Sequence, residues 1–144
     1  MLVQQILGSK AGGGVLSVKP TDSVSEAVKL LSEKRIGSVV VSADGESLDG
    51  ILSERDVVRE IGRRGAVVLT EPVGALMTSQ IVTCTEKDTA DRILQMMTDG
   101  RFRHLPVMRD GKMIGLISIG DVVKARLAEL SMEKNALEGM IMGH

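Results

Sequence analysis

The sequence lacks tryptophan and tyrosine and contains a single phenylalanine, Phe102. Proteins that bind single-stranded nucleic acid stack the bases on aromatic side chains, so this shortage argues against that class. The formal net charge is only −1, and a chain so close to neutrality has no overall electrostatic attraction for nucleic acid or for an anionic membrane. We therefore expect neither nucleic acid nor a membrane among its partners.

Cysteine is almost absent as well, since Cys84 is the only one. A single cysteine cannot form an intrachain disulfide, which is typical of a reducing compartment. No apolar run approaches the roughly 20 residues that a membrane-spanning helix needs. Residues 1–10 also lack the basic stretch and the long apolar run of a signal peptide. The sequence therefore predicts a cytoplasmic protein.

What the chain does contain is a repeat, and its 144 residues hold two copies of one unit. Residues 15–18 align with residues 81–84 at a separation of 66 positions, which also places Asp44-Gly45 on Asp110-Gly111. After the loss of one residue, residues 50–58 align with residues 115–123. We expect a first repeat with a short lead-in helix at 1–62, a linker at 63–72, a second repeat at 73–130 and a helical C-terminal extension at 131–144.

Each copy predicts the element order β-α-β-β-α. A β-rich run (15–18 or 81–84) precedes a polar corner, whose aspartate, Asp22 or Asp88, is expected to cap an amphipathic helix. Two strands around an Asp-Gly turn then lead into a second helix, which starts at Glu54 or Ile119. The strands are expected at 38–42, 48–52, 105–108 and 113–117.

One such unit has a small sheet with one apolar face, which it cannot bury alone. Two copies can bury these faces against each other. We therefore expect a single α+β domain, in which the two repeats pack face to face about a pseudo-twofold axis.

Two Ser-x-x-Asp segments, Ser53–Asp56 and Ser118–Asp121, allow two interpretations. A serine at the N-cap with an acid three residues later is close to a capping box, although capping alone would favour Glu or Gln. A helix N-terminus also offers N–H groups to a phosphate, and a carboxylate one turn in can accept hydrogen bonds from ribose hydroxyls. The two interpretations are compatible.

A basic pair, Arg103-His104, precedes the apolar strand of the second repeat. A guanidinium beside a partly protonatable imidazole suits a phosphate; the alternative is a solvent-facing arginine and a strand-end histidine. Arg55 lies at a helix N-terminus, where a cation opposes the helix dipole, and this favours an anionic partner. The matching positions hold Gly37-Ser38 and Gly120, so the cations favour the site that contains Asp56.

Other features predict structure rather than chemistry. Gly12–Gly14 is not followed by Lys-Ser or Lys-Thr and is expected to be a loop, and Cys84 is expected to be a buried strand residue. His144 with scattered acids makes no metal site. An adaptable apolar face, for core or dimer contacts, is indicated by Met132, Met140 and Met142. We find no set of nucleophile, base and oxyanion donors, and therefore expect no enzyme.

Over nearly the whole chain this pattern resembles the CBS-domain family. The resemblance rests on the two Gly-hydrophobic-hydrophobic-Ser-x-x-Asp segments (50–56 and 115–121) and on the strand His104–Val107. The sequence is similar to small stand-alone bacterial proteins that consist of one CBS pair, or Bateman module. This resemblance implies a regulatory protein that binds AMP, ADP or ATP in the cleft between the repeats, with NAD(H) or S-adenosylmethionine as alternatives. It also implies a disc-like homodimer and a partner protein that responds to ligand binding.

The resemblance further implies which residues hold the ligand. In nucleotide-binding relatives the aspartate binds ribose, the basic pair binds phosphate, and one site combines the aspartate of one repeat with the basic pair of the other. The implied nucleotide-binding residues are Ser17, Ser53, Arg55, Asp56, Val82, Thr83, Arg103, His104, Ser118 and Asp121. The alternative is a structural module with degenerate sites, which acts in dimerisation or partner docking.

Overall fold

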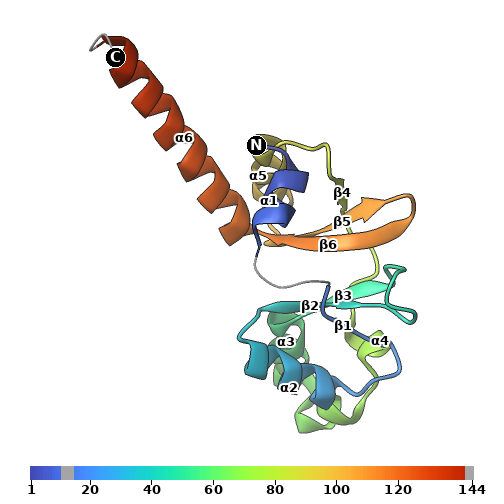
Figure 1. Cartoon of the computed structure of the whole chain (residues 1–144). Coiled ribbons are helices and arrows are strands. Elements are labelled where there is room, and N and C mark those ends of the chain that lie inside the picture. The colour runs from blue at the N-terminus through green and yellow to red at the C-terminus, as the bar shows by residue number, and fades with distance from the viewer. Residues whose placement is uncertain (11–14, 142–144) are drawn as a thin grey trace. The chain divides into compact units, whose positions relative to one another are not determined.

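The computed structural model describes residues 1–10 and 15–141, which form two compact units (Figure 1). Unit 1 contains residues 1–10, 83–108 and 115–141, and unit 2 contains residues 15–82 and 109–114. The N-terminal segment thus belongs to the unit built mainly from the second repeat. The loop expected at Gly12–Gly14, Met142 and His144 lie outside the described residues.

Both repeats have the expected order β-α-β-β-α, and the α+β class is confirmed. The elements of the first repeat and its surroundings are α1 (Val3–Ser9), β1 (Ser17–Val18), α2 (Val24–Lys34), β2 (Ser38–Val41), β3 (Gly50–Ser53), α3 (Glu54–Arg64) and the 3-10 helix η1 (Ala66–Thr70). Those that follow are α4 (Val73–Leu76), β4 (Cys84–Thr85), α5 (Ala90–Gly100), β5 (His104–Arg109), β6 (Lys112–Ser118) and α6 (Ile119–Ile141).

Each repeat forms one three-stranded sheet, ordered β1-β2-β3 and β4-β5-β6. In the parallel ladders Val18 pairs with Val41, and Cys84 pairs with Val107. Both residues of the second pair lie 66 positions after those of the first, so the strand register agrees with the sequence alignment. The two sheets are therefore equivalent in construction.

The strands β1 and β4 are shorter than expected. Residues 15–16 and 81–83 lie outside them, because only Ser17 and Val18 of the first run and Cys84 of the second have a partner on the neighbouring strand. Strand β3 also starts later than expected, at Gly50. The residues before it form a loop in which Asp44 Oδ1 accepts the N–H groups of Glu46 and Ser47, at 2.9 and 2.7 Å.

The prediction that Asp22 and Asp88 cap α2 and α5 is wrong by one residue. The N-caps are Ser23 and Thr89, whose hydroxyls each accept the N–H three residues later, at 3.1 Å. Asp22 and Asp88 instead accept the N–H three residues earlier, at 2.8 Å in both cases. Each aspartate closes the turn before its helix, and the hydroxyl that follows is left to cap the helix.

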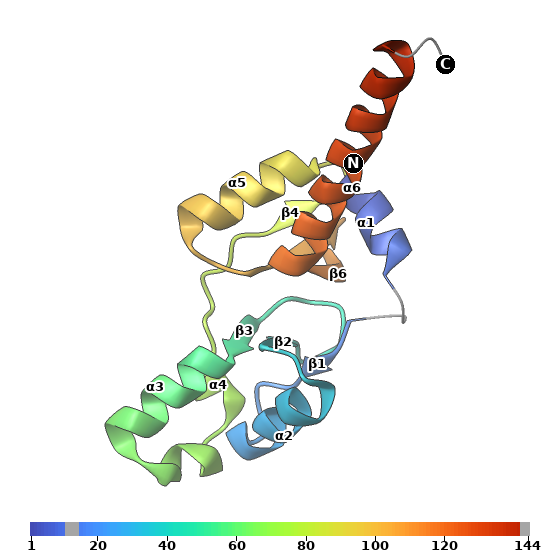
Figure 2. The ribbon, with the colours of Figure 1, turned by 90° about the vertical axis from the view of Figure 1, so that its left-hand side faces the viewer.

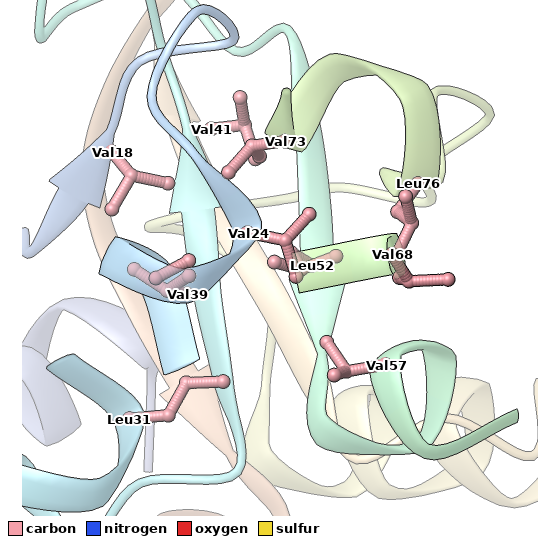
Figure 3. Close-up of a cluster of buried hydrophobic side chains, with 11 residues drawn as sticks. Val18, Val24, Leu31, Val39, Val41, Leu52, Val57, Val68, Val73 and Leu76 are labelled. Atoms are coloured by element: carbon pink, nitrogen blue, oxygen red, sulfur yellow. The ribbon is translucent and has the colours of Figure 1, made fainter. Parts of the chain in front are cut away.

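The core of unit 2 lies between its sheet and the helices α2 and α3 (Figures 1 and 2). Leu52, Val41 and Val24 are fully buried in this cluster (Figure 3). The short helix η1, which falls in the stretch expected as a linker, adds the fully buried Val68. This packing fixes the start of α3 against the end of β3.

Two glycines of the repeated motif lie where another segment crosses the strand. A Cβ on Gly50 would lie 2.9 Å from the carbonyl oxygen of Thr78, a residue that forms a β-bridge with Ile51. A Cβ on Gly115 would lie 2.7 Å from a terminal methyl carbon of Leu7 in α1. The Cβ on Gly50 would also meet the side chain of Met77, with its sulfur at 2.6 Å, so its obstacles are a side chain and backbone, whereas the obstacle at Gly115 is the end of a flexible side chain.

We expect Gly50→Ala to lower the free energy of unfolding by about 1–3 kcal/mol, because the backbone around Thr78 must shift. Gly115→Ala should lower the free energy of unfolding by less, since the side chain of Leu7 can rotate away. Urea unfolding of both variants provides the measurement. If both variants lose the same free energy of unfolding, or if Gly115→Ala loses more, the close approach of Thr78 is not the reason for glycine at position 50.

Helix α6 is the longest element and continues beyond α1 and α5 within unit 1 (Figures 1 and 2). Only Val122 and Ala125 of this helix are buried. Within residues 1–10 and 15–141, no helix combines the length and the apolar character needed to cross a bilayer.

Candidate functional site

The Ser-x-x-Asp segment of the first repeat joins the end of β3 to the first turn of α3. Ser53 Oγ accepts the N–H of Asp56 at 3.2 Å, and the Ser53 N–H donates to Asp56 Oδ2 at 3.1 Å. The Ser53 hydroxyl also donates to Asp56 Oδ2, at 2.9 Å. The structure therefore confirms the capping interpretation here, with Asp56 in the place that Glu or Gln usually takes.

The second oxygen of Asp56 is held by an arginine that the sequence did not single out. Arg59 donates to Asp56 Oδ1 at 2.8 Å, from one turn further along α3. Arg55, the cation expected to bind an anion, is exposed and lines a shallow depression on α3 together with Glu54, Val58 and Arg59. A buried carboxylate with its own cation is thus the main electrostatic feature of this helix start.

A buried hydroxyl lies beside this helix start. Ser38 is 4% exposed, and its hydroxyl has no hydrogen-bond partner within the described part of the chain. Ser38 pairs with Ser53 across the β2–β3 ladder, so the two side chains lie on the same face of the sheet. The carbonyl oxygen of Gly37 accepts the N–H of Glu54 at 2.9 Å. The start of α3 therefore combines a carboxylate, a bonded hydroxyl and an unsatisfied hydroxyl.

The second repeat has the same arrangement at the start of α6. Ser118 Oγ accepts the N–H of Asp121 at 3.1 Å, and the Ser118 N–H donates to Asp121 Oδ2 at 2.9 Å. Here the cation is Lys10, whose Nζ lies 2.9 Å from Asp121 Oδ2 and also donates to the carbonyl oxygen of Leu116 at 2.9 Å. Lys10 follows α1 and shares no motif with residues 118–121, so no sequence pattern could have identified it.

These contacts set the protonation of Asp121. Burial would raise the pKa of its carboxyl group, but the hydrogen bonds from Ser118 and Lys10 and the charge of Lys10 together lower it. The carboxylate is therefore ionised at neutral pH. Its contribution to stability is present above the unfolded-state pKa of Asp and is lost as the pH falls through the lowered native value.

The basic pair Arg103-His104 lies next to the start of α6. His104 is the first residue of β5 and is half-buried, whereas Arg103 is exposed. The carbonyl oxygen of Arg103 accepts the N–H of Ile119 at 2.8 Å, the counterpart of the Gly37–Glu54 bond. The pair and Asp121 therefore belong to unit 1, and Asp56 belongs to unit 2. The implied combination of Asp56 with Arg103 and His104 stays a prediction.

The remaining candidates flank the first strands of the two repeats. Ser17 lies in β1 and is half-buried, and Val82 and Thr83 precede β4 and are exposed. Leu16 and Val82, which align at the separation of 66, are 47% and 48% exposed and therefore do not belong to a strand core. Cys84, in contrast, lies in the strand core. Burial and, to a smaller extent, the charge of Asp88 raise the pKa of its thiol to about 12, which leaves the thiol protonated and unreactive.

Chemically, each helix start can bind a diol and an anion. The carboxylate accepts hydrogen bonds from hydroxyl groups, and the first-turn N–H groups with the nearby cation attract negative charge. Within the described residues, no group of three or more His, Cys, Asp or Glu side chains lies close enough together to hold a metal ion.

Comparison with known proteins agrees with this repeated construction. The model of the CBS domain matches residues 13–63 and 73–128. The chain is 39% identical over 145 residues to the CBS domain-containing protein CBSX3, mitochondrial, of Arabidopsis thaliana, covering 98% of this chain and 70% of that protein.

Solved structures show the same fold. A CBS-domain containing protein from Agrobacterium tumefaciens superposes with a TM-score of 0.82 at 42% identity, covering 88% of this chain and 99% of that one. CBSX2 in complex with AMP superposes with a TM-score of 0.72 at 28% identity, covering 88% and 96%. Since the family model covers both repeats and these relatives align over most of the chain, this protein belongs to the CBS-domain family and contains a tandem pair of CBS domains.

Proposed function

We propose that this protein is a regulatory module that binds an adenosyl ligand, and not an enzyme. The observation that carries the proposal is the pair of equivalent helix starts, each with a Ser-x-x-Asp carboxylate that already holds a cation. Following the resemblance, one ligand would contact residues of both repeats.

The ribose hydroxyls are expected to bind the motif carboxylates. Its two hydroxyls can donate to Asp56 or Asp121 in place of the present cation, and both hydroxyls then bond to a charged acceptor. Arg59 or Lys10, once displaced, becomes available to the phosphate of the same ligand. Such an exchange leaves the carboxylate hydrogen-bonded and gives the displaced cation an anionic partner, which lowers its cost in a partly buried site. The orphan hydroxyl of Ser38 supports a polar ligand at the start of α3.

The adenine would rest on aliphatic side chains. Leu16 and Val82 support this role, since both expose about half of an apolar side chain at equivalent positions of the two repeats. Ser17 and Thr83, the residues that follow them, offer hydroxyls to the ring nitrogens. This arrangement needs no aromatic residue, in agreement with the composition.

AMP, ADP and ATP are the favoured ligands, with NAD(H) and S-adenosylmethionine as alternatives. The complex of the similar CBSX2 with AMP supports a nucleotide. Arg103 and His104, next to the start of α6, would contact its phosphate. A partner protein would then respond to the change that binding causes in the packing of the module.

A docking module with degenerate sites is the second candidate. Both capping boxes are complete without a ligand, and this observation favours it. In that case Asp56 and Asp121 would serve only to cap their helices.

Calorimetric titration with AMP, ADP, ATP, NAD and S-adenosylmethionine separates the two candidates, with ribose 5-phosphate as a control that lacks the base. We expect saturable heat for at least one adenosyl compound, and a stabilisation of about 2.7 kcal/mol at a ligand concentration one hundred times the dissociation constant. Because the chain has no Trp or Tyr, absorbance near 260 nm also reports bound adenine after gel filtration. If millimolar concentrations of all five compounds give neither heat nor a shift in melting temperature, the docking module is the correct function.

A further inference from the structure

The cation at the second motif carboxylate comes from outside the repeat. Lys10 Nζ lies 2.9 Å from Asp121 Oδ2 and donates to the carbonyl oxygen of Leu116 at 2.9 Å. The CBS-domain model begins to match only at residue 13. The repeated motif therefore does not account for this ion pair, and its role has to be sought in the site itself.

The backbone of Lys10 is held in place through α1. The N–H of Val3 donates to the carbonyl oxygen of Asp88 at 2.9 Å, and Val3 and Ile6 are buried. At the other end of the helix, the Lys10 N–H donates to the carbonyl oxygen of Leu7 at 3.3 Å. The side chain of Lys10 is 38% exposed, so its amine can leave the carboxylate by rotation while α1 stays bound.

The first repeat has an uncharged residue at the equivalent position. Helix α4 binds unit 2 as α1 binds unit 1, since the Val73 N–H donates to the carbonyl oxygen of Asp22 at 2.8 Å. Val73 follows Val3 at a separation of 70 positions, and the same separation places Gln80 at the position of Lys10. The lysine is thus specific to the second site.

Lys10 occupies an acceptor that a ribose would use. A ribose diol that bonds to both carboxylate oxygens of Asp121 must take the place of the ammonium group at Oδ2. A neutral nucleoside offers the displaced ammonium no anionic partner. A nucleotide does, because the flexible four-carbon stem of the lysine lets the amine move to a phosphate of the same ligand and form a charge-assisted hydrogen bond there.

We propose that Lys10 determines the ligand specificity of the Asp121 site. It competes with the hydroxyls of a neutral nucleoside for the carboxylate, and it binds the phosphate of a nucleotide once it is displaced. This assignment rests on the proposed function and goes further, because it makes the second site selective for phosphorylated adenosyl ligands over adenosine.

The first test needs no ligand. Lys10→Met, which keeps a side chain of similar length, should raise the pKa of the Asp121 carboxyl group, because the hydrogen bond and the charge of Lys10 both lower it. A carboxyl ¹³C NMR titration measures this pKa. Lys87→Met removes an equal charge from an exposed position of unit 1 and should leave the pKa unchanged. If Lys10→Met also leaves it unchanged, Lys10 does not hold the carboxylate, and the assignment is wrong.

Calorimetry with AMP and adenosine tests the specificity, in chains that carry Asp56→Asn so that Asp121 is the only motif carboxylate left. Lys10→Met should reduce the preference for AMP over adenosine about tenfold or more, because AMP loses a charge-assisted hydrogen bond and adenosine loses a competitor. Lys10→Arg keeps the charge and should retain most of the preference. Lys87→Met should retain all of it.

The outcomes separate this assignment from the proposed function. AMP binding with an unchanged preference in Lys10→Met overturns the role of Lys10 and leaves the adenosyl-binding function intact. AMP binding to the wild-type chain but not to the Asp56→Asn chain also overturns it, because the Asp121 site then takes no ligand. If neither compound binds the wild-type chain, although Lys10→Met raises the pKa of Asp121, the proposed binding of a nucleotide is wrong, and the specificity assignment with it.

Discussion

Replacing Leu52 by alanine is expected to lower the free energy of unfolding by about 2–5 kcal/mol, the range for large-to-small substitutions in a packed core. Leu52 is fully buried in β3 and lies within the cluster formed with Val39, Val57 and Val68 (Figure 3). The sheet, α3 and η1 all contribute to this cluster, so no single element can move to fill the cavity. Urea unfolding, followed by circular dichroism, measures the loss.

Val58→Ala is a suitable control in the same unit. Val58 lies on α3 next to the buried Val57 but is 69% exposed, so its truncation should change the free energy of unfolding by no more than about 0.5 kcal/mol. A loss below about 1 kcal/mol for Leu52→Ala would mean that the site repacks, and that the cluster does not fix the start of α3.

The second large effect concerns the two motif aspartates. The double variant Asp56→Asn/Asp121→Asn is expected to weaken AMP binding at least about a hundredfold, because two hydrogen bonds from ribose to a charged acceptor contribute about 1.5–3 kcal/mol each. Asparagine keeps an oxygen that can accept the N–H of Ser53 or Ser118, so the helix caps survive. Calorimetry gives the affinity, and thermal unfolding without ligand verifies the fold.

Asp22→Asn/Asp88→Asn is the matched control. It removes the same two charges, and each of these aspartates also accepts a backbone N–H from three residues earlier. AMP affinity should stay at the wild-type value. Unchanged affinity in Asp56→Asn/Asp121→Asn would limit those carboxylates to capping, and an equal loss in both double variants would assign the effect to net charge.

Much of the fold follows from the sequence alone. The alignment at a separation of 66 predicted two equivalent repeats, and the ladders agree with it, since Val18 pairs with Val41 and Cys84 with Val107. The Ser-x-x-Asp spacing predicted capping boxes at α3 and α6. Both features can be found from the sequence, because a repeat is detected by aligning the chain with itself and a capping motif spans only four residues.

Local rules also failed where two neighbours could do the same task. At the start of α2, both Asp22 and Ser23 can cap a helix, and the sequence does not say which one closes the preceding turn instead. The apolar runs that contain Leu16 and Val82 were expected to be strands, but strand formation requires a partner strand, and the pattern does not specify where the partner ends.

Only the tertiary structure decided which cations hold the motif carboxylates and why the motif begins with glycine. Lys10 reaches Asp121 because α1 lies in unit 1, and a Cβ on Gly50 would meet Met77 and the carbonyl oxygen of Thr78, a residue that bridges to β3. Likewise, Met132 and Met140 could have served the core, and only the fold shows that both are exposed. Contacts between segments far apart in sequence depend on the path of the whole chain, whereas a pattern within one segment records only that segment's own geometry.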